Sequence, residues 1–251
     1  MIYNLPELYD EQYQYYRDDL NFYTQLAHDY GSPVLELGAG TARVSLALAK
    51  AGFAVTGIEL SEAMVKVGLE KIARANLTDR VTLMQGDMRR LELSQTFPVV
   101  IAPFNTLMHT YTLQNQDATL ASVKRHLEPG GVFAFDVYTP NFRDLNVLKR
   151  EAEWEHVGGK HAELFLYQSL DADNQILESR YYLDTVREDG TLTRQTSTLK
   201  QRFYTRFELE RLLYGAGFQN VQIYGGFDKR RYGAKEPVMV VVARPPRPHL
   251  Q

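Results

Sequence analysis

The sequence contains no cysteine, which excludes disulfides, thiolate metal sites and a cysteine nucleophile. A formal net charge of -3 gives no excess of basic residues, and this argues against a nucleic-acid partner. The apolar runs are far shorter than the roughly 20 residues that a membrane-spanning helix needs. The first residues lack the basic segment and apolar core of a signal peptide. We therefore expect a cytoplasmic protein with no membrane partner.

What the sequence does contain is an ordinary globular composition, with 44% hydrophobic and 24% charged residues. From Val34 onward, short apolar segments alternate with segments of helical period. The apolar segments predict strands, and they cover 34–37, 54–58, 81–84, 98–102 and 132–137. The segments between them predict helices at 44–50, 61–75 and 116–127. Apolar strands that are each followed by a helix indicate a doubly wound, mostly parallel sheet.

The flanking regions depart from this alternation. Residues 7–30 carry tyrosines and leucines at helical spacing, whereas 141–204 read as an antiparallel meander of at least three strands. A capping box at Thr205 begins a further helix, which two last strands follow. The predicted fold class is α/β, with a seven-stranded sheet. The predicted parts are a helical lid (1–33), a ligand-binding core (34–140), a β insertion serving as substrate lid (141–204), the end of the core (205–244) and a tail (245–251).

The first functional signal is a glycine turn between the first strand and its helix. Gly38 and Gly40 allow a ligand to approach the backbone, and the helix N-terminus offers amide donors. A dinucleotide-binding turn would place a third glycine where this chain has Arg43, which argues against a pyrophosphate. Glu36, just before the turn, adds a negative charge that suits a cationic ligand such as an amino acid ammonium.

Two further acids follow at the ends of the next strands. Glu59 ends the second strand, where a carboxylate can accept both hydroxyl hydrogens of a ribose. Asp87 follows the third strand, where it can accept from an exocyclic amino group while Met88 lies against the ring. Together these acids predict a nucleoside ligand without saying which one.

The ordered set of these motifs, with Leu127-Glu128-Pro129-Gly130-Gly131 before the fifth strand, resembles class I S-adenosylmethionine-dependent methyltransferases. The resemblance covers about residues 34–140 and implies a Rossmann-like fold with S-adenosylmethionine as cofactor. It also implies roles for individual residues. By this resemblance, Glu36, Gly38, Ala39 and Gly40 surround the methionine part of the cofactor, and Glu59 holds the ribose. Leu60 and Met64 lie near the adenosine, and Asp87 and Met88 hold the adenine. Phe104 lies beside the sulfonium.

A looser resemblance points to bacterial enzymes that methylate small molecules, such as amino-sugar and glycine N-methyltransferases. The segment 102–106 reads Ala-Pro-Phe-Asn-Thr and lacks the Asn/Asp-Pro-Pro-Tyr/Phe motif of enzymes that methylate exocyclic amines of bases or of glutamine. His109 is either a general base or a loop histidine bonded to the backbone. Asn105 is a candidate for orienting the substrate. Tyr9, Tyr13 and Tyr16 either close over the cofactor or pack on the sheet.

We therefore expect in-line methyl transfer to nitrogen or oxygen of a small-molecule acceptor. The alternatives are a nucleotide-dependent oxidoreductase, a non-catalytic S-adenosylmethionine-binding module and, with less support from the charge, an RNA methyltransferase. No metal is expected, because His156, His161 and the acids around them fit no known ligand spacing. A homodimer is left open.

Overall fold

The computed structural model describes residues 6–13, 15–157, 160–187, 189–233 and 235–246. These residues form two compact units, one of residues up to 139 together with 204–246, and one of residues 140–203. Each unit is described by itself. Within the described residues, no helix combines the length and the apolar character that crossing a bilayer requires.

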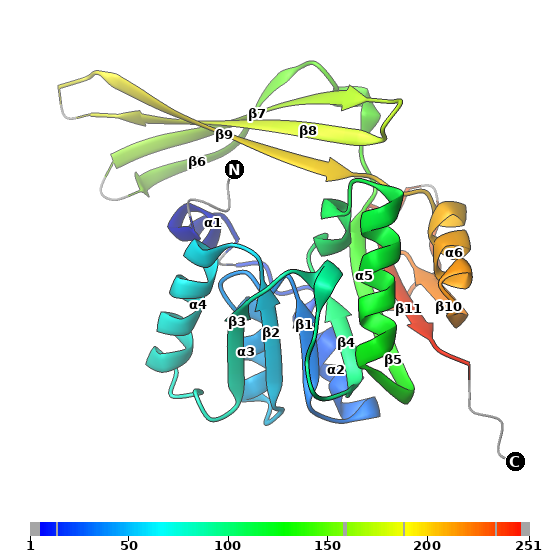
Figure 1. Ribbon diagram of the computed structural model, residues 1–251. Helices are drawn as coiled ribbons and strands as arrows, with labels where there is room; N and C mark the ends of the chain where they lie inside the picture. Colours follow the sequence, from blue (N-terminus) through cyan, green and yellow to red (C-terminus); the bar gives the residue numbers. More distant parts are fainter. Residues whose placement is uncertain (1–5, 14, 158–159, 188, 234, 247–251) are drawn as a thin grey trace, which may run out of the picture. The chain divides into compact units, whose positions relative to one another are not determined.

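The larger unit is built on a seven-stranded sheet with the order β10-β11-β5-β4-β1-β2-β3 (Figure 1). The strands are β1 Val34–Leu37, β2 Val55–Glu59, β3 Val81–Gln85, β4 Phe97–Ala102, β5 Leu127–Tyr138, β10 Gln219–Tyr224 and β11 Val238–Arg244. Strands β1 to β5 run parallel, and β11 is antiparallel to both of its neighbours. The order reverses between β1 and β4, which is where doubly wound sheets bind ligands at the carboxyl ends of their strands.

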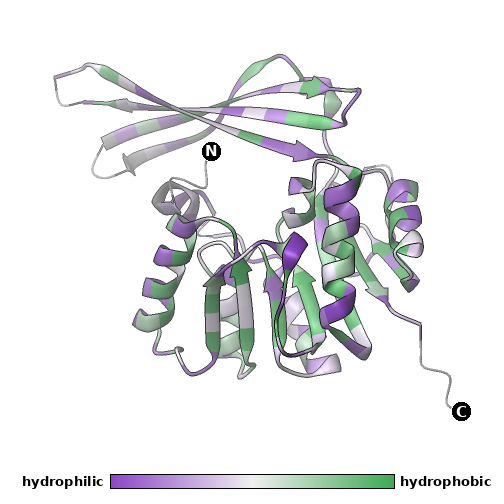
Figure 2. Ribbon diagram, in the orientation of Figure 1, coloured by the Kyte–Doolittle hydropathy of each residue, from purple (hydrophilic) through white to green (hydrophobic). Residues whose placement is uncertain are grey.

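Helices cover both faces of this sheet, with α2 and α3 on one face and α5 on the other (Figure 1). The helices of this unit are α1 Pro6–Tyr13, α2 Leu20–Tyr30, α3 Arg43–Lys50, α4 Glu62–Arg74, α5 Leu113–His126 and α6 Arg206–Gly215, with short 3-10 turns η2 Met88–Arg90 and η3 Thr106–His109. The 3-10 turn η4 Phe142–Asp144 belongs to the smaller unit. The central strands are mostly hydrophobic (Figure 2), and fully buried side chains such as Phe133 and Phe135 fill the interior. Burial on both faces explains why these strands lack strict alternation.

The smaller unit is a four-stranded antiparallel sheet with the order β6-β7-β8-β9. Its strands are β6 Leu148–Val157, β7 Lys160–Asp171, β8 Ile176–Val186 and β9 Leu192–Arg202. The β7–β8 turn is held by the Asp171 carboxylate, which accepts from the Asn174 backbone at 3.2 Å. The β8–β9 turn has Gly190 at a φ of 79°, although Glu188 in the same predicted hairpin lies outside the described residues.

The doubly wound fold and the inserted meander are confirmed, and so are two predicted caps. The Ser61 hydroxyl accepts from the Met64 N–H to begin α4, and Thr205 and Glu208 form the capping box of α6. Two local predictions were wrong. Residues 7–30 form the two helices α1 and α2 and not one, and β5 already begins at Leu127. The four strands of the smaller sheet agree with the predicted meander of at least three strands, although no strand was predicted at the position of β6. Most of the predicted tail, 247–251, lies outside the described residues.

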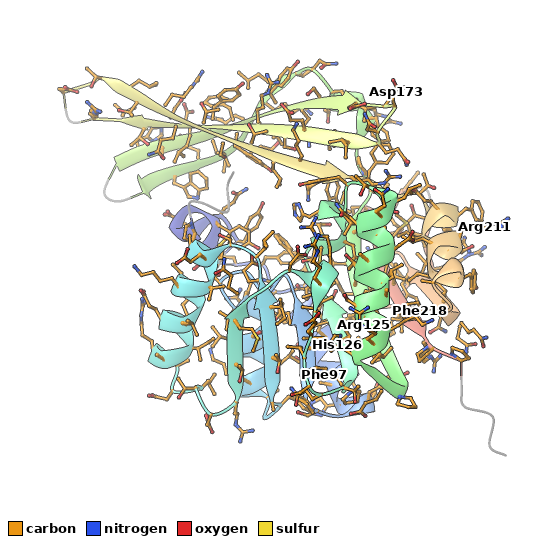
Figure 3. All side chains as sticks on the ribbon, viewed as in Figure 1. Phe97, Arg125, His126, Asp173, Arg211 and Phe218 are labelled. Carbon is orange, nitrogen blue, oxygen red and sulfur yellow. The ribbon has the colours of Figure 1, made fainter. Side chains whose placement is uncertain are left out.

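His126, at the end of α5 (Figure 3), illustrates a histidine with a purely structural role. Its Nε2 accepts the Leu93 N–H at 3.0 Å, and its Nδ1 lies 2.7 Å from the Ser122 carbonyl oxygen. Both ring nitrogens are therefore occupied. This pairing ties the segment after η2 to α5.

Candidate cofactor site

The glycine turn between β1 and α3 adopts the geometry that its sequence demands. Gly38, Gly40 and Ala42 have φ values of 66°, 55° and 67°, a region that L residues seldom adopt. A Cβ at Gly38 would lie 2.5 Å from the Thr106 Oγ1, so only glycine fits there. A Cβ at Gly40 would meet nothing within 4 Å. The turn is therefore closed against η3 at Gly38 and open at Gly40.

Helix α4 approaches the same turn closely because it carries a glycine of its own. A Cβ at Gly68 would lie 3.3 Å from the Thr41 carbonyl carbon and 2.5 Å from a Leu83 methyl. The neighbouring Gly57 on β2 is crowded in the same way, with Ala39 and Leu83 at 3.0 Å. These contacts fix the positions of the glycine turn, β2 and α4 relative to one another.

Glu59 is held beside the turn by two backbone donors. The Gly40 N–H donates to Oε2 at 2.9 Å, and the Ser61 N–H at the start of α4 donates to Oε1 at 2.8 Å. A carboxylate can accept about four hydrogen bonds, so these two leave capacity for a ligand diol. The structure thus brings Glu59 and Gly40 together as the sequence predicted for neighbouring parts of one site.

Glu36 lies in the middle of β1 and is only 2% exposed. Burial raises the pKa of its carboxyl to about 7, although the Ser45 hydroxyl donates a hydrogen bond and the Arg43 guanidinium opposes the rise. A buried acid costs the protein free energy when it is ionised. Such a group is typical of a site that binds a cation, and this is the role expected for Glu36 from the sequence.

The acid expected at the adenine already has a partner. Asp87 caps η2 by accepting the Arg89 N–H at 2.9 Å, and the Arg89 guanidinium lies 2.6 Å from its other oxygen. The Arg89 side chain keeps the pKa of Asp87 below its ordinary value. Met88 begins η2 and is half-buried. Contact of both residues with an adenine stays a prediction.

The two residues expected near the adenosine differ in exposure. Leu60 follows β2 and is 62% exposed, so its side chain is available to a ligand. Met64 on α4 is 1% exposed and packs in the interior. Direct contact between Met64 and a ligand would therefore require a shift of its neighbours.

Phe104 lies in an aromatic cluster with Tyr9, Tyr13 and Tyr16. Its ring centroid is 4.8 Å from that of Tyr13, 5.2 Å from that of Tyr16 and 6.3 Å from that of Tyr9. The Arg43 guanidinium lies 5.1 Å from the Tyr16 ring and 5.4 Å from the Phe104 ring. The three tyrosines therefore gather around Phe104 beside the glycine turn, and the Tyr16 and Phe104 rings face a cation, the Arg43 guanidinium.

The N-terminal segment, residues 6–13 and 15–19, is bound to this edge by two ion pairs. Arg43 forms a bidentate pair with Asp19, whose side chain is 0% exposed, at 2.6 and 2.7 Å. Lys71 on α4 lies 3.0 Å from both oxygens of Asp10 and also donates to the Thr41 hydroxyl. Arg43, which replaces the third glycine of a dinucleotide turn, thus connects the turn to this segment.

Sequence reasoning missed two buried acids at this edge, Asp19 and Asp136. Asp136 lies near the end of β5 and is 2% exposed. Its Oδ1 accepts from the Tyr23 hydroxyl at 2.6 Å and from the Phe104 N–H at 2.8 Å. An acid inside the apolar run Val132-Phe-Ala-Phe-Asp-Val was the signal that could have found it.

His109, the candidate base, ends η3 and is half-buried. Its Nδ1 lies 3.3 Å from the Tyr111 hydroxyl, and the two rings meet edge to face with centroids 6.3 Å apart. Burial raises the pKa of Tyr111 above its ordinary value. The pairing with Tyr111 orients His109, and the action of His109 on an acceptor stays a prediction.

In the smaller unit, ligand atoms of Glu153, His161 and Glu163 lie within 4.8 Å of one another. The Arg150 guanidinium is 2.9 Å from each of the two carboxylates. These acids therefore already face a cation supplied by the protein. The side chains of Glu155 and His156, which belong to the same sequence cluster, lie outside the described part of the chain.

The glycine turn, the acid at the end of β2 and the switch point of the sheet are the features with which α/β proteins of this class bind nucleosides. A family model described as a methyltransferase domain matches residues 34–131. An uncharacterized methyltransferase of Geobacillus sp. (strain WCH70) is 32% identical over 164 residues, which cover 62% of this chain and 70% of the relative. The cypemycin N-terminal methyltransferase of Streptomyces sp is 26% identical over 222 residues, covering 84% and 82%.

Among solved structures, the CcbJ methyltransferase from Streptomyces caelestis aligns with a TM-score of 0.79 and 27% identity, covering 91% of this chain and 90% of that one. The chain belongs to the class I S-adenosylmethionine-dependent methyltransferases. S-adenosylmethionine is therefore its cofactor. This membership decides against the oxidoreductase alternative, since the donor is a methyl sulfonium and not a nicotinamide.

Proposed function

We propose that the protein transfers the methyl group of S-adenosylmethionine to a nitrogen of a small-molecule amine. The observation that carries the choice of nitrogen is the aromatic cluster beside buried acids. When a neutral amine attacks the sulfonium methyl, positive charge moves from sulfur to nitrogen. Aromatic faces and carboxylates stabilise such a cation at both ends of the transfer. The relative named for N-terminal methylation supports an amine acceptor as well.

The cofactor roles assigned to single residues belong to this proposal. Glu36, Gly38, Ala39 and Gly40 hold the methionine part, and Glu59 holds the ribose. Leu60, Met64, Asp87 and Met88 line the adenosine, and Phe104 lies by the sulfonium. When bound, S-adenosylmethionine supplies an activated methyl group, so the protein contributes mainly alignment and exclusion of water.

The cofactor chemistry fits the donor set in this structure. The backbone turns left-handed at Gly38 and Gly40 and leaves open space at Gly40. Two acids, Glu36 and Glu59, flank that turn and match an ammonium and a ribose diol. The roles of residues 1–33 and 141–204 as lids, the cytoplasmic location and the oligomeric state stay predictions.

An oxygen acceptor is the second candidate, and His109 is the observation that favours it. A hydroxyl group must lose its proton during attack, whereas a neutral amine need not lose one beforehand. If the acceptor is a hydroxyl, His109 at the end of η3 is the half-buried side chain that would serve as the base. Its loss would then reduce turnover by a factor on the order of 100 or more.

The experiment that separates the two compares matched pairs of amines and their hydroxyl analogues as acceptors. The wild-type protein is incubated with S-adenosylmethionine, and S-adenosylhomocysteine and the methylated product are measured by mass spectrometry. Methylation of amines, with a small effect of His109→Gln, is the expected result. Methylation of hydroxyl compounds alone, with a large loss in His109→Gln, would overturn the choice of nitrogen. Binding without any turnover would favour a sensor.

A further inference from the structure

The loop after β4 contains two consecutive residues with left-handed backbone, and neither is glycine. Phe104 has a φ of 56° and Asn105 a φ of 66°. This conformation costs free energy for L residues, and for a bulky aromatic residue it is especially uncommon. The surrounding structure must therefore stabilise the loop, and the contacts of Asp136 show how.

Asp136 accepts hydrogen bonds from the backbone of both residues. The Phe104 N–H donates to its Oδ1 at 2.8 Å, and the Asn105 N–H donates to its Oδ2 at 3.3 Å. Successive backbone N–H groups that converge in this way form a concavity suited to an anion. The Asn105 Oδ1 in turn accepts the Tyr138 N–H at 2.7 Å, which ties the loop to β5 a second time.

The groups that face Asp136 come from the same region. The Tyr23 hydroxyl on α2 donates to Oδ1 at 2.6 Å. Burial and the negative charge of Asp19, in the N-terminal segment, raise the pKa of Asp136, and burial and the charge of Asp136 in turn raise the pKa of Tyr16. Within the described residues, no Lys or Arg forms a salt bridge with Asp136. The negative charge is therefore compensated by the two N–H groups and one hydroxyl alone.

The loop conformation has a direct consequence for the cofactor site. Because Asp136 holds the backbone of Phe104, it also fixes the direction of the Phe104 ring. That ring contacts all three tyrosines of the aromatic cluster and faces Arg43 at 5.4 Å. Release of the loop would therefore disturb the N-terminal segment and the wall proposed for the sulfonium at the same time.

We infer that Asp136 is a positioning residue of the cofactor site, which sets the affinity for S-adenosylmethionine by holding the Phe104–Asn105 loop through its two N–H groups. The inference rests on the proposed place of Phe104 beside the sulfonium. It does not depend on which acceptor is methylated.

The first test is calorimetric titration of S-adenosylmethionine into Asp136→Asn. The amide keeps the size of the carboxylate but presents an NH2 group to one of the two N–H donors. A loss of affinity of at least tenfold is expected. The matched control is Asp117→Asn, an exposed acid on α5, which should leave the affinity unchanged. Equal affinities of Asp136→Asn and wild type would overturn the inference.

A double-mutant cycle with Phe104→Gly distinguishes positioning from a general loss of stability. Glycine adopts the left-handed conformation without strain and carries no ring. In that background, Asp136→Asn should weaken S-adenosylmethionine binding by less than about threefold, because nothing is left to position. Full additivity of the two losses would contradict the inference. If Phe104→Gly alone leaves cofactor affinity unchanged, the proposed place of Phe104 is wrong instead.

The pH dependence of S-adenosylmethionine affinity is a further test, because a merely structural role of Asp136 would not change it. Burial raises the pKa of Asp136 to about 6, while the Tyr23 hydroxyl and the two N–H groups oppose the rise. Since the ionised form holds the loop, affinity should fall as pH decreases through this value. Tyr23→Phe keeps the carboxylate and removes one donor, so the fall should begin at a higher pH. If Asp136→Asn does not fold, the pH profile of cofactor affinity in Tyr23→Phe serves as the test. A profile equal to that of the wild type would then overturn the inference. Glu36→Gln isolates the separate contribution of Glu36.

Discussion

Replacing Glu36 by glutamine is expected to make the ligand-free protein more stable above neutral pH, and at the same time to weaken cofactor binding. The side chain is 2% exposed and accepts a hydrogen bond from the Ser45 hydroxyl. Glutamine has nearly the same shape and keeps an oxygen for this bond. What it removes is the cost of holding a charge in the interior.

The magnitude follows from the pKa of Glu36, which burial raises from 4.5 to about 7. A raised carboxyl pKa means that the folded state binds the proton more tightly than the unfolded state, so stability declines as pH rises through this interval. Compared with a group that does not titrate, Glu36 lowers the free energy of unfolding by about 3 kcal/mol at about pH 8 and by about 1 kcal/mol at about pH 5.5. The gain in Glu36→Gln should therefore be larger by about 2 kcal/mol at the higher pH.

Urea unfolding of wild type and Glu36→Gln at both pH values measures this difference directly, since all other titrating groups are common to both proteins. Titration of S-adenosylmethionine at the higher pH should show at least tenfold weaker binding to the variant, because the cationic ligand loses its carboxylate. A variant that gains no stability at either pH, or the same amount at both, would refute the electrostatic reasoning. Gained stability with unchanged cofactor affinity would refute the role of Glu36 in binding.

Three further substitutions give distinct outcomes. Gly38→Ala combines a left-handed φ with a close approach to Thr106 and should lower the free energy of unfolding by about 2 to 4 kcal/mol in urea. The added Cβ of Gly40→Ala meets no neighbour, so this change should lower the free energy of unfolding by only about 1 kcal/mol. It should nevertheless weaken S-adenosylmethionine binding more than tenfold in a titration. Unchanged binding would count against this turn as the cofactor site. Arg43→Met leaves the Asp19 carboxylate buried without its partner and should lower the free energy of unfolding by about 3 to 5 kcal/mol in urea. The double variant Arg43→Met with Asp19→Asn should recover part of this loss.

Much of the fold could be predicted because its strands are short, apolar and separated by punctuating residues. The helix and strand boundaries that failed did so where two signals overlapped. In the N-terminal region, tyrosines and leucines keep one helical period from Tyr9 to Leu26, whereas α1 ends at Tyr13 and α2 begins only at Leu20. Strand β6 escaped notice because its charged residues alternate with few apolar ones, as befits an edge strand.

The site could be predicted only where a local motif carries it. Gly38, Gly40 and Glu59 lie at strand ends, and the sheet topology alone brings these positions together. The bonds from Asp136 to the Phe104–Asn105 loop, and from Arg43 to Asp19, join residues far apart in sequence. No spacing rule encodes such pairs. A buried acid in an apolar strand indicates that a partner exists, but the partner becomes known only from the three-dimensional structure.

We propose that the edge of the sheet at Gly38, Gly40 and Glu59 binds S-adenosylmethionine for methyl transfer. The most direct test is parallel calorimetric titration of the wild-type protein with S-adenosylmethionine, S-adenosylhomocysteine and NAD, with Glu59→Ala as the matched variant. We expect binding of the first two at micromolar concentrations, no binding of NAD, and loss of S-adenosylmethionine binding in Glu59→Ala. Binding of NAD alone, or undiminished S-adenosylmethionine binding by Glu59→Ala, would contradict it.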